Sequence, residues 1–299
     1  MTECPIVVTG GTGQLGYDLA RALIPLGRVV TPTRAEFDLA SAASIRAFIR
    51  ENQPRLIVNA AAYTAVDCAE SEHEVCTLIN AVAPGVIAEG MASIGGALIH
   101  FSTDYVFDGA NDDPYSEADT PAPLNIYGET KLEGERAIAR AGAAHIILRT
   151  SWLYSMHGRN FVRSILRLSR EREELRVVSD QIGAPTWTRT LAGQTAAIVE
   201  RLDPDERGLA GAMMAASGVY HLTSAGSASW YEVAETVLRH DPRRGEQRTQ
   251  RIVPIATADY PSAARRPLNS RLDNAKIVET FGLGRSCWRD DIAAALREA

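Results

Sequence analysis

The sequence has few cysteines, and their placement is uninformative about metal binding. Cys4, Cys68, Cys76 and Cys287 are scattered along 299 residues, with no CxxC pair and no spacing typical of a metal site. This pattern excludes a disulfide framework of the kind that small secreted domains need. We therefore expect reduced thiols in a cytoplasmic protein.

The sequence also lacks a block of one charge sign. It carries 31 Lys and Arg against 37 Asp and Glu, a net charge of −6, which gives no electrostatic reason to expect nucleic acid or a membrane surface as a partner. No apolar run approaches the roughly 18 residues of a membrane-spanning helix. The first residues show neither the basic nor the apolar region of a signal peptide, so we expect none.

What is present is the composition of a globular protein. Hydrophobic residues make up 45% of the chain and charged residues 23%, which excludes the disordered and collagen-like classes. A chain of this length can form one large domain or two fused domains.

Short apolar runs alternate with helical patterns through the first 150 residues. Strands that are apolar throughout and separated by helices indicate a parallel sheet covered on both faces. We therefore predict a Rossmann-type, doubly wound α/β domain over residues 1–150. Its expected strands are 6–9, 28–31, 56–59, 97–102 and 145–149, and its expected helices follow Gln14 and Ser41 and span 74–91 and 127–141.

The pattern loosens after Thr150. We predict that residues 151–299 mainly form a smaller lobe at the carboxyl edge of the sheet, with some segments returning to the first domain. The charged stretch 167–176 is interpreted as a solvated helix face and 241–251 as an exposed connection. The expected elements are helices at 161–173, 191–202 and 230–240 and a short strand at 177–178.

A glycine-rich turn follows the first predicted strand directly. Glycines in this pattern permit a tight turn and let the backbone approach a pyrophosphate, while the following helix offers its first amides to the phosphates. An ordinary tight turn between strand and helix is the alternative. We predict a dinucleotide site formed by Gly10, Gly11, Thr12, Gly13, Gln14, Leu15 and Gly16.

The end of the second strand bears on the choice of dinucleotide. Thr31-Pro32-Thr33-Arg34 lacks the acidic residue that binds the ribose 2′-hydroxyl of NAD. Arg34 is suited to a 2′-phosphate, which favours NADPH over NADH, although a plain surface arginine is the alternative.

Tyr127 and Lys131 form the candidate acid–base pair. Four residues on a helix place the two side chains on one face. A phenol has an ordinary pKa of about 10, so it serves acid–base chemistry near neutrality only if a neighbour stabilises its anion, as an ammonium does. The alternative is a pair of side chains on an ordinary helix.

Hydroxyl and carboxyl side chains follow the fourth predicted strand. Ligands of such sheets bind at the carboxyl ends of the strands. The hydroxyl of Ser102 or Thr103 could hold a carbonyl oxygen for reduction, and the alternative for both residues, as for Asp104 and Asp108, is a bond to the backbone of the turn.

Six longer stretches carry a more specific signal than the glycine turn. They are residues 59–67 (NAAAYTAVD), 102–109 (STDYVFDG), 121–131 (PAPLNIYGETK), 149–154 (RTSWLY), 180–186 (DQIGAPT) and 266–270 (RPLNS). With the three elements above, they resemble the extended short-chain dehydrogenase/reductase superfamily and, within it, the dTDP-4-dehydrorhamnose reductases. The likeness runs over nearly the whole chain.

The resemblance implies a reaction and a role for each candidate residue. The reaction is the NAD(P)H-dependent reduction of the C4 keto group of dTDP-4-dehydro-L-rhamnose to dTDP-L-rhamnose, for surface polysaccharide such as lipopolysaccharide. Tyr127 would protonate the C4 oxygen. Lys131 would hold the nicotinamide ribose and lower the pKa of Tyr127, and Thr103 would polarise the carbonyl.

The resemblance also implies binding residues, with a substrate-binding role for the smaller lobe. Trp152 would pack against the deoxysugar, for which a core tryptophan is the alternative, and Arg266 would face the nucleotide diphosphate, for which a surface basic pair with Arg265 is the alternative. Cofactor contacts are expected from Arg34, Asp38, Leu39, Ala62, Tyr63, Thr64, Tyr127 and Lys131, and substrate contacts from Thr103, Asp104, Tyr105, Trp152, Arg266 and Asn269.

Two other functions fit parts of the same sequence. One is a nucleotide-sugar epimerase or dehydratase, although a dehydratase would carry an Asp-Glu pair where this chain has Asp104 and Tyr105. The other is a non-catalytic, NADP-binding regulatory subunit like that of methionine adenosyltransferase. A homodimer and Mg²⁺ are left open, and no metal ligand is assigned because Asp18 alone does not make a site.

Overall fold

The computed structural model describes residues 4–203 and 208–298. Its centre is a six-stranded sheet with the order β10-β5-β4-β3-β1-β2, in which every neighbouring pair is parallel. The strands are β1 (Ile6–Thr9), β2 (Val29–Val30), β3 (Leu56–Asn59), β4 (Ala97–Thr103), β5 (Ala144–Thr150) and β10 (Gly218–His221). Because β2 and β3 lie on opposite sides of β1, the strand order reverses there, and a crevice opens at the carboxyl ends. The predicted doubly wound α/β fold is confirmed.

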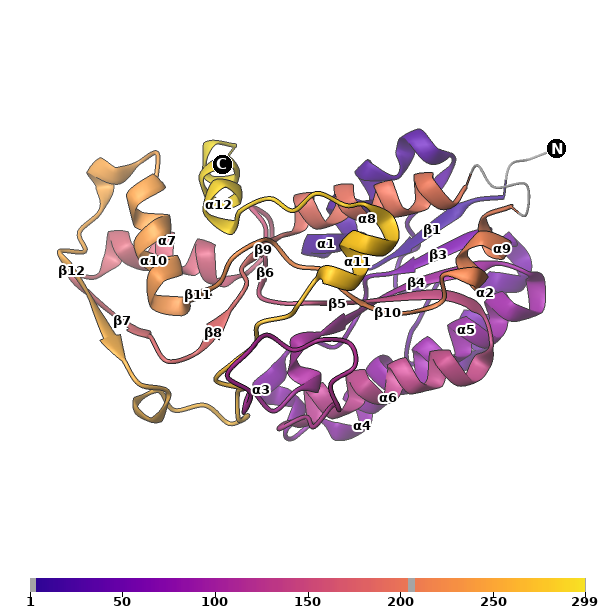
Figure 1. Ribbon diagram of the computed structural model, residues 1–299, viewed down its shortest axis with the longest axis horizontal. Helices are drawn as coiled ribbons and strands as arrows, with labels where there is room; N and C mark the ends of the chain where they lie inside the picture. The colour runs from indigo at the N-terminus through magenta and orange to yellow at the C-terminus, as the bar shows by residue number, and fades with distance from the viewer. Residues whose placement is uncertain (1–3, 204–207, 299) are drawn as a thin grey trace.

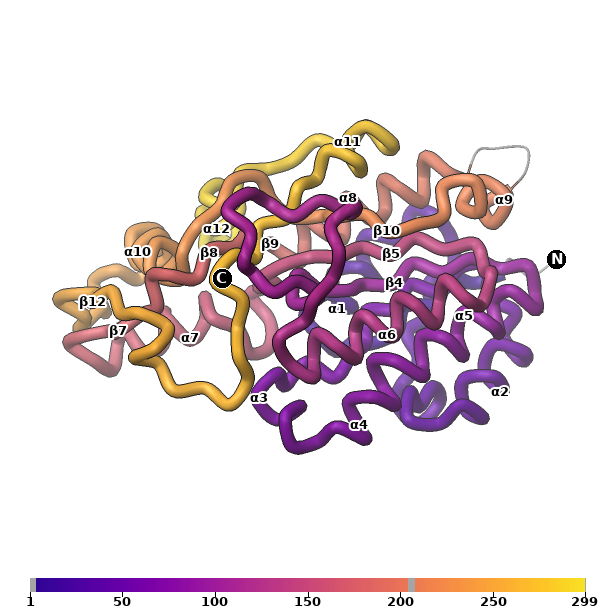
Figure 2. The backbone as a smooth tube through the Cα atoms, turned by 60° about the horizontal axis from the view of Figure 1, so that its bottom comes forward, coloured from indigo at the N-terminus to yellow at the C-terminus, as the bar shows by residue number. Residues whose placement is uncertain are grey.

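Helices cover both faces of this sheet (Figure 1). One face packs against α1 (Gln14–Ala22), α8 (Thr188–Leu202), α9 (Gly208–Ala215) and α11 (Ala275–Phe281). The other packs against α2 (Ala42–Asn52), α5 (Ala83–Ile94) and α6 (Ile126–Ala141), which lie side by side in front of the sheet in Figure 2. The short α3 (Val66–Ala69) and α4 (His73–Thr77) lie near the start of α6.

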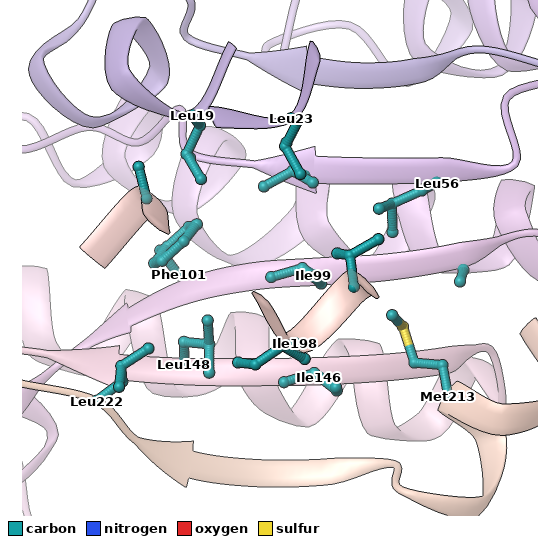
Figure 3. Packing of buried hydrophobic residues seen from close by; sticks show 14 of the residues in the cluster. Leu19, Leu23, Leu56, Ile99, Phe101, Ile146, Leu148, Ile198, Met213 and Leu222 are labelled. Atoms are coloured by element: carbon teal, nitrogen blue, oxygen red, sulfur yellow. The ribbon is translucent and has the colours of Figure 1, made fainter. Parts of the chain in front are cut away.

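The alternation of side chains along the strands divides the core into two layers. In β1, Ile6 and Val8 pack toward the α1 face, while Val7 packs toward the α5 face. Figure 3 shows the first layer, where Leu19 of α1 and Ile198 of α8 meet the buried strand residues. The strands are therefore buried on both faces of the sheet, as their continuous apolar sequences predict.

A smaller lobe lies beyond the carboxyl ends of the strands, on the left of Figure 1. It has its own core, to which Trp187, Trp288 and residues of three helices contribute. The helices are α7 (Phe161–Glu171), α10 (Trp230–His240) and α12 (Trp288–Arg297), and the strand pairs are β6 (Leu153–Tyr154) with β9 (Thr186–Trp187), β7 (Glu174–Val178) with β12 (Arg251–Ile255), and β8 (Ile182–Gly183) with β11 (Ala228–Ser229).

Several expectations for the second half need correction. The sixth strand, β10, and the helix α9 were not predicted, and α8 begins at Thr188 rather than at residue 191. The stretch 167–176 is not one solvated helix face, because α7 ends at Glu171 and Leu175 is buried in β7. Within 241–251, Asp241 is buried, and both of its carboxylate oxygens accept hydrogen bonds from Arg170, which offset the cost of burying the charge.

The expectation that no segment approaches membrane-spanning length is wrong for one helical run. His73–Ile94 is formed by α4, a π-helical turn (Leu78–Val82) and α5. By length and composition alone, this run is long and apolar enough to cross a membrane. The run is apolar because it lies in the protein core. Its helix α5 packs between α2 and α6, and 56% of its most apolar window is buried inside the protein. A core helix of this kind passes the same test as a membrane span.

Candidate active site

Two adjoining cavities lie at the crevice where the strand order reverses. The larger has a volume of about 680 Å³ and extends from the glycine turn, past the ends of β4 and β5, to the smaller lobe. The other, of about 400 Å³, lies over the ends of β1 and β2. Both are lined by Gly10, Thr12, Ala61 and Ala62, so a long ligand could occupy the two together.

The glycine turn is built for close approach of the backbone. Gly10 has a left-handed φ of +69°, and its carbonyl accepts a hydrogen bond from Gly13 N–H at 2.8 Å. A Cβ atom on Gly16 would lie 2.1 Å from that carbonyl oxygen, so only glycine fits there. Helix α1 starts after Gly13 with no side-chain cap, which leaves amides available to phosphate oxygens. This turn fits the pyrophosphate of a dinucleotide.

The smaller cavity has the residues expected around an adenosine group. Gly11, Arg34, Asp38, Leu39 and Ala62 line it. The side chain of Arg34 is 82% exposed, and its Nε lies 3.8 Å from a carboxylate oxygen of Asp38. A guanidinium so weakly held can turn toward a phosphate at the mouth of the cavity.

The start of α6 places Tyr127 beside the end of β4. Asn125 caps the helix by accepting a hydrogen bond from Gly128 N–H at 2.8 Å. A Cβ on Gly128 would lie 2.1 Å from the carbonyl oxygen of Tyr105, so glycine is required for this close approach. The approach brings the Tyr127 ring edge-on to the Tyr105 ring, at 5.9 Å between centroids, and into the larger cavity.

Burial raises the pKa of the Tyr127 phenol, and the negative charge of Asp104 adds to the effect. This differs from the expected lowering by Lys131. A raised pKa keeps the phenol protonated at neutral pH, which is the state that a proton donor needs.

Lys131 lies one helical turn after Tyr127 and is 2% exposed. Its ammonium donates to the carbonyl oxygen of Phe101 at 2.6 Å and lies 3.1 Å from Nε2 of His100. Burial lowers the pKa of Lys131 to about 8. The side chain also lines the larger cavity, so it faces the same space as Tyr127.

Thr103 ends β4 and is bonded to the neighbouring carboxylate. Its hydroxyl donates to Asp104 Oδ1 at 3.0 Å and accepts from Tyr105 N–H at 3.2 Å. Asp104 is 3% exposed, and its other oxygen accepts from Ser151 at 3.3 Å. Burial raises the pKa of Asp104 to about 6, although hydrogen bonds from Ser270 and Thr103 oppose the rise.

An aromatic wall closes the cavity on the side of the smaller lobe. Trp152 has a left-handed φ of +48°, uncommon for a bulky residue, and its ring stacks on that of Trp230 at 3.6 Å and 7°. Both rings line the larger cavity. Trp230 Nε1–H donates to Gln181 Oε1 at 3.1 Å, which fixes the orientation of its ring.

The structure brings most of the predicted residues into the two cavities and places five outside their linings. Gly16 packs inside the glycine turn. The Tyr63 hydroxyl donates to Glu72 at 2.9 Å, and Tyr105 packs on Tyr127. Arg266 pairs with Asp67 at 2.7 Å, and Asn269 uses its amide to hold the carbonyls of Asn111 and Asp113 and the backbone N–H of Arg271.

The described residues give no support for a metal centre. Among residues 4–203 and 208–298 there is no group of three or more His, Cys, Asp or Glu side chains that could hold an ion. The carboxylate of Asp18 accepts a hydrogen bond from Thr188 at 2.5 Å.

Sequence reasoning missed the lobe residues that complete the cavity. Trp230 begins α10, whose start is marked in the sequence by a Ser229-x-x-Glu232 capping box that the structure contains. That signal places a helix but not a cavity wall. The other lining residues from this lobe and its connections include Leu153, Tyr154, Gly158, Arg159, Asn160, Phe161, Val162, Pro185 and Val233.

Comparisons with known proteins agree with this geometry. Residues 4–299 match the family described as "RmlD substrate binding domain". The chain is 44% identical to a dTDP-4-dehydrorhamnose reductase of Burkholderia thailandensis, over 98% of both chains, and 42% identical to one of Escherichia coli strain K12, over 98% of this chain and 97% of the relative. A crystal structure of dTDP-4-dehydrorhamnose reductase from Bacillus anthracis in complex with NADP superposes with a TM-score of 0.88, at 32% identity and full coverage of both chains. The chain belongs to the dTDP-4-dehydrorhamnose reductase family.

Proposed function

We propose that Tyr127, Lys131 and Thr103 carry out the reaction of this family in the larger cavity. That reaction, which the chain catalyses, is the reduction of the C4 keto group of dTDP-4-dehydro-L-rhamnose to dTDP-L-rhamnose with a nicotinamide cofactor. The observation that carries the assignment of residues is their convergence, because all three side chains line one cavity that is continuous with the glycine turn.

The proton is handled by the protein. NADPH, when bound along the glycine turn, supplies the hydride that reaches C4. The raised pKa of Tyr127 keeps its proton in place until negative charge develops on the C4 oxygen, which is then a much stronger base than the phenolate. Lys131 faces the same cavity, where its ammonium would hold the hydroxyls of the nicotinamide ribose. Thr103 holds the carbonyl oxygen once its hydroxyl turns from Asp104 to the substrate.

The substrate is bound by residues of both parts of the chain. Trp152, backed by Trp230, offers an aromatic face to the deoxysugar. Asp104 and Tyr105 lie at the end of β4, and Arg266 reaches the nucleotide diphosphate if it exchanges Asp67 for phosphate oxygens. Asn269 supports the site by holding the loop at Asn111. We assign residues 1–150, with α8, α9, β10 and α11, to the cofactor domain and the rest mainly to the substrate lobe.

The preference for NADPH depends on Arg34 in this account. Arg34→Ala is expected to raise KM for NADPH about tenfold, the loss of one exposed charge-assisted hydrogen bond, and to leave KM for NADH unchanged. Initial rates with each cofactor measure the effect. Arg50→Ala, an exposed arginine of α2 outside both cavities, is the control. Equal changes for both cofactors would contradict a contact with the 2′-phosphate.

The charge of Lys131 predicts a pH dependence. Since burial lowers the pKa of Lys131 to about 8, the ammonium is present below that pH and is lost above it. We expect kcat/KM for NADPH, which reports groups of the free enzyme, to fall as pH rises through about 8. A profile that stays level through that pH would show that the ammonium is not required.

The state of the cysteines bears on the location of the enzyme. All four cysteines are free, which suits a reducing compartment, so we infer a cytoplasmic enzyme. A homodimer remains a prediction. No observation on the described residues favours an epimerase or a regulatory subunit over the reductase.

A further inference from the structure

The buried side of Lys131 carries a second set of contacts that the reaction itself does not use. The ammonium has three N–H donors and no acceptor. One donates to the Phe101 carbonyl at 2.6 Å and one points to His100 Nε2 at 3.1 Å. Both partners are on β4, and of the two only Phe101 lines the larger cavity. This arrangement leaves one donor for the cavity that Tyr127 also lines, where it would be available to a hydroxyl of the cofactor.

His100 is held in turn by Asn59, which Thr9 holds, and both of these residues lie at the ends of neighbouring strands. Its Nδ1 lies 3.0 Å from the side-chain amide of Asn59 on β3, and that amide accepts a hydrogen bond from Thr9 of β1 at 2.6 Å. Thr9, Asn59 and His100 are each at most 2% exposed. The Thr9 hydroxyl also accepts from Ala61 N–H at 3.2 Å. The chain of contacts therefore joins Lys131 to the strand ends that form the two cavities.

We propose that His100 is a positioning residue for Lys131, holding its ammonium through Nε2 at the place and in the charge state that the reduction requires. The inference rests on the proposed role of Lys131 in that reduction. It adds a second layer to the site, in which Thr9 and Asn59 fix the ring of His100 and His100 fixes Lys131.

The chemistry of the contact determines the tautomer. An ammonium cannot accept a hydrogen bond, so Nε2 of His100 must accept while Lys131 is charged, and Nδ1 must carry the proton. The structure places the amide nitrogen of Asn59 toward Nδ1, so this tautomer requires a half-turn of that amide, after which Nδ1–H donates to the Asn59 carbonyl oxygen. The amide nitrogen of Asn59 then donates to the Thr9 hydroxyl, in place of the bond that Thr9 gives to the carbonyl oxygen. Burial holds the pKa of His100 well below its usual range, so the ring stays neutral.

Other titratable groups act on the same ammonium. Glu135 on α6 favours the charged form of Lys131, and Cys76 on α4 does so when ionised. Tyr127 lies one turn away on α6. None of these groups accepts a hydrogen bond from Lys131, whereas His100 and the Phe101 carbonyl provide its two contacts on β4. If His100 served only to form hydrogen bonds within the core, replacing it would lower the stability of the protein and leave the pKa of Lys131 unchanged.

Two substitutions of His100 separate these roles. A Gln amide reaches the position of Nε2 and can still accept from Lys131, whereas an Asn amide reaches only the position of Nδ1 and keeps the contact with Asn59. We expect His100→Asn to lose kcat about tenfold and to move the alkaline limb of kcat/KM for NADPH down by about one pH unit, the worth of one hydrogen bond to a charged group. His100→Gln should recover most of both losses.

Two further measurements complete the test. NADPH binding, followed by fluorescence, should weaken several-fold in His100→Asn and less in His100→Gln. If His100→Asn fails to fold, Asn59→Ala, which frees the ring, should move the alkaline limb in the same direction by a smaller amount. A His100→Asn or Asn59→Ala enzyme with a lowered Tm and an unshifted pH profile would overturn the inference.

Lys131→Met distinguishes this inference from the proposed function. If Lys131→Met is inactive while His100→Asn keeps the wild-type profile, the role of His100 is wrong and that of Lys131 stands. If Lys131→Met turns over like the wild type, the proposed role of Lys131 is wrong, and the inference falls with it.

Discussion

Tyr127→Phe is expected to lower kcat by about 10³-fold, the usual contribution of a positioned general acid. The ring remains in the cavity, edge-on to Tyr105, so the packing at the start of α6 is kept and only the proton source is removed. Binding of NADPH, measured by fluorescence titration, should change less than about threefold, because the glycine turn and Lys131 are untouched.

The control for this substitution is a tyrosine far from the cavity. Tyr260 is 56% exposed and lines neither of the two cavities of the site, so Tyr260→Phe should retain full turnover. The assignment of Tyr127 fails if its phenylalanine variant retains more than about a tenth of the wild-type kcat with NADPH binding intact.

Glu135→Leu is expected to lower the free energy of unfolding by about 4 kcal/mol, a large loss for one residue. Glu135 and Arg149 form an ion pair at 2.6 Å, with side chains that are 4% and 5% exposed. Glu135 also accepts from the Ser102 hydroxyl at 2.5 Å, and Nη1 of Arg149 has no hydrogen-bond partner in the described structure. Without Glu135, the guanidinium is a buried charge with no carboxylate partner among the described residues, and the Phe107 ring, 5.1 Å from Cζ of Arg149, lies against it.

The double variant Glu135→Leu, Arg149→Met tests the cause. Removing both charges removes the uncompensated guanidinium, so the double variant should recover about 2 kcal/mol relative to Glu135→Leu alone. Urea denaturation of the wild type, the two single variants and the double variant measures these differences. A double variant that is less stable than either single variant would contradict the argument, as would a single variant as stable as the wild type.

The sequence predicted those elements of the fold whose own residues carry a clear pattern and whose ends are marked by turn residues. The strands β1, β3, β4 and β5 are apolar runs bounded by turns, and α10 occurs at Trp230–His240 as predicted. The strand β10 could not be found in this way. This strand has only four residues, of mixed polarity. They form a strand because they pair with the open edge of β5.

The site divides along the same line. The glycine turn and the pair Tyr127 and Lys131 are readable because each lies within a few residues of sequence, where turn and helix geometry fix their relation. Trp230 and His100 are not readable, because their roles depend on contacts with Trp152 and Lys131 that only the packing of separate elements creates. Asn269 was predicted to contact the substrate because it lies in a stretch typical of the family. In the structure, its side-chain amide is fully occupied by hydrogen bonds within the protein.

The reaction itself is tested most directly by following NADPH absorbance with the purified protein and dTDP-4-dehydro-L-rhamnose made in situ. The account predicts oxidation of NADPH that depends on the sugar nucleotide, with dTDP-L-rhamnose formed in equal amount. Binding of NADPH without substrate-dependent oxidation would contradict it.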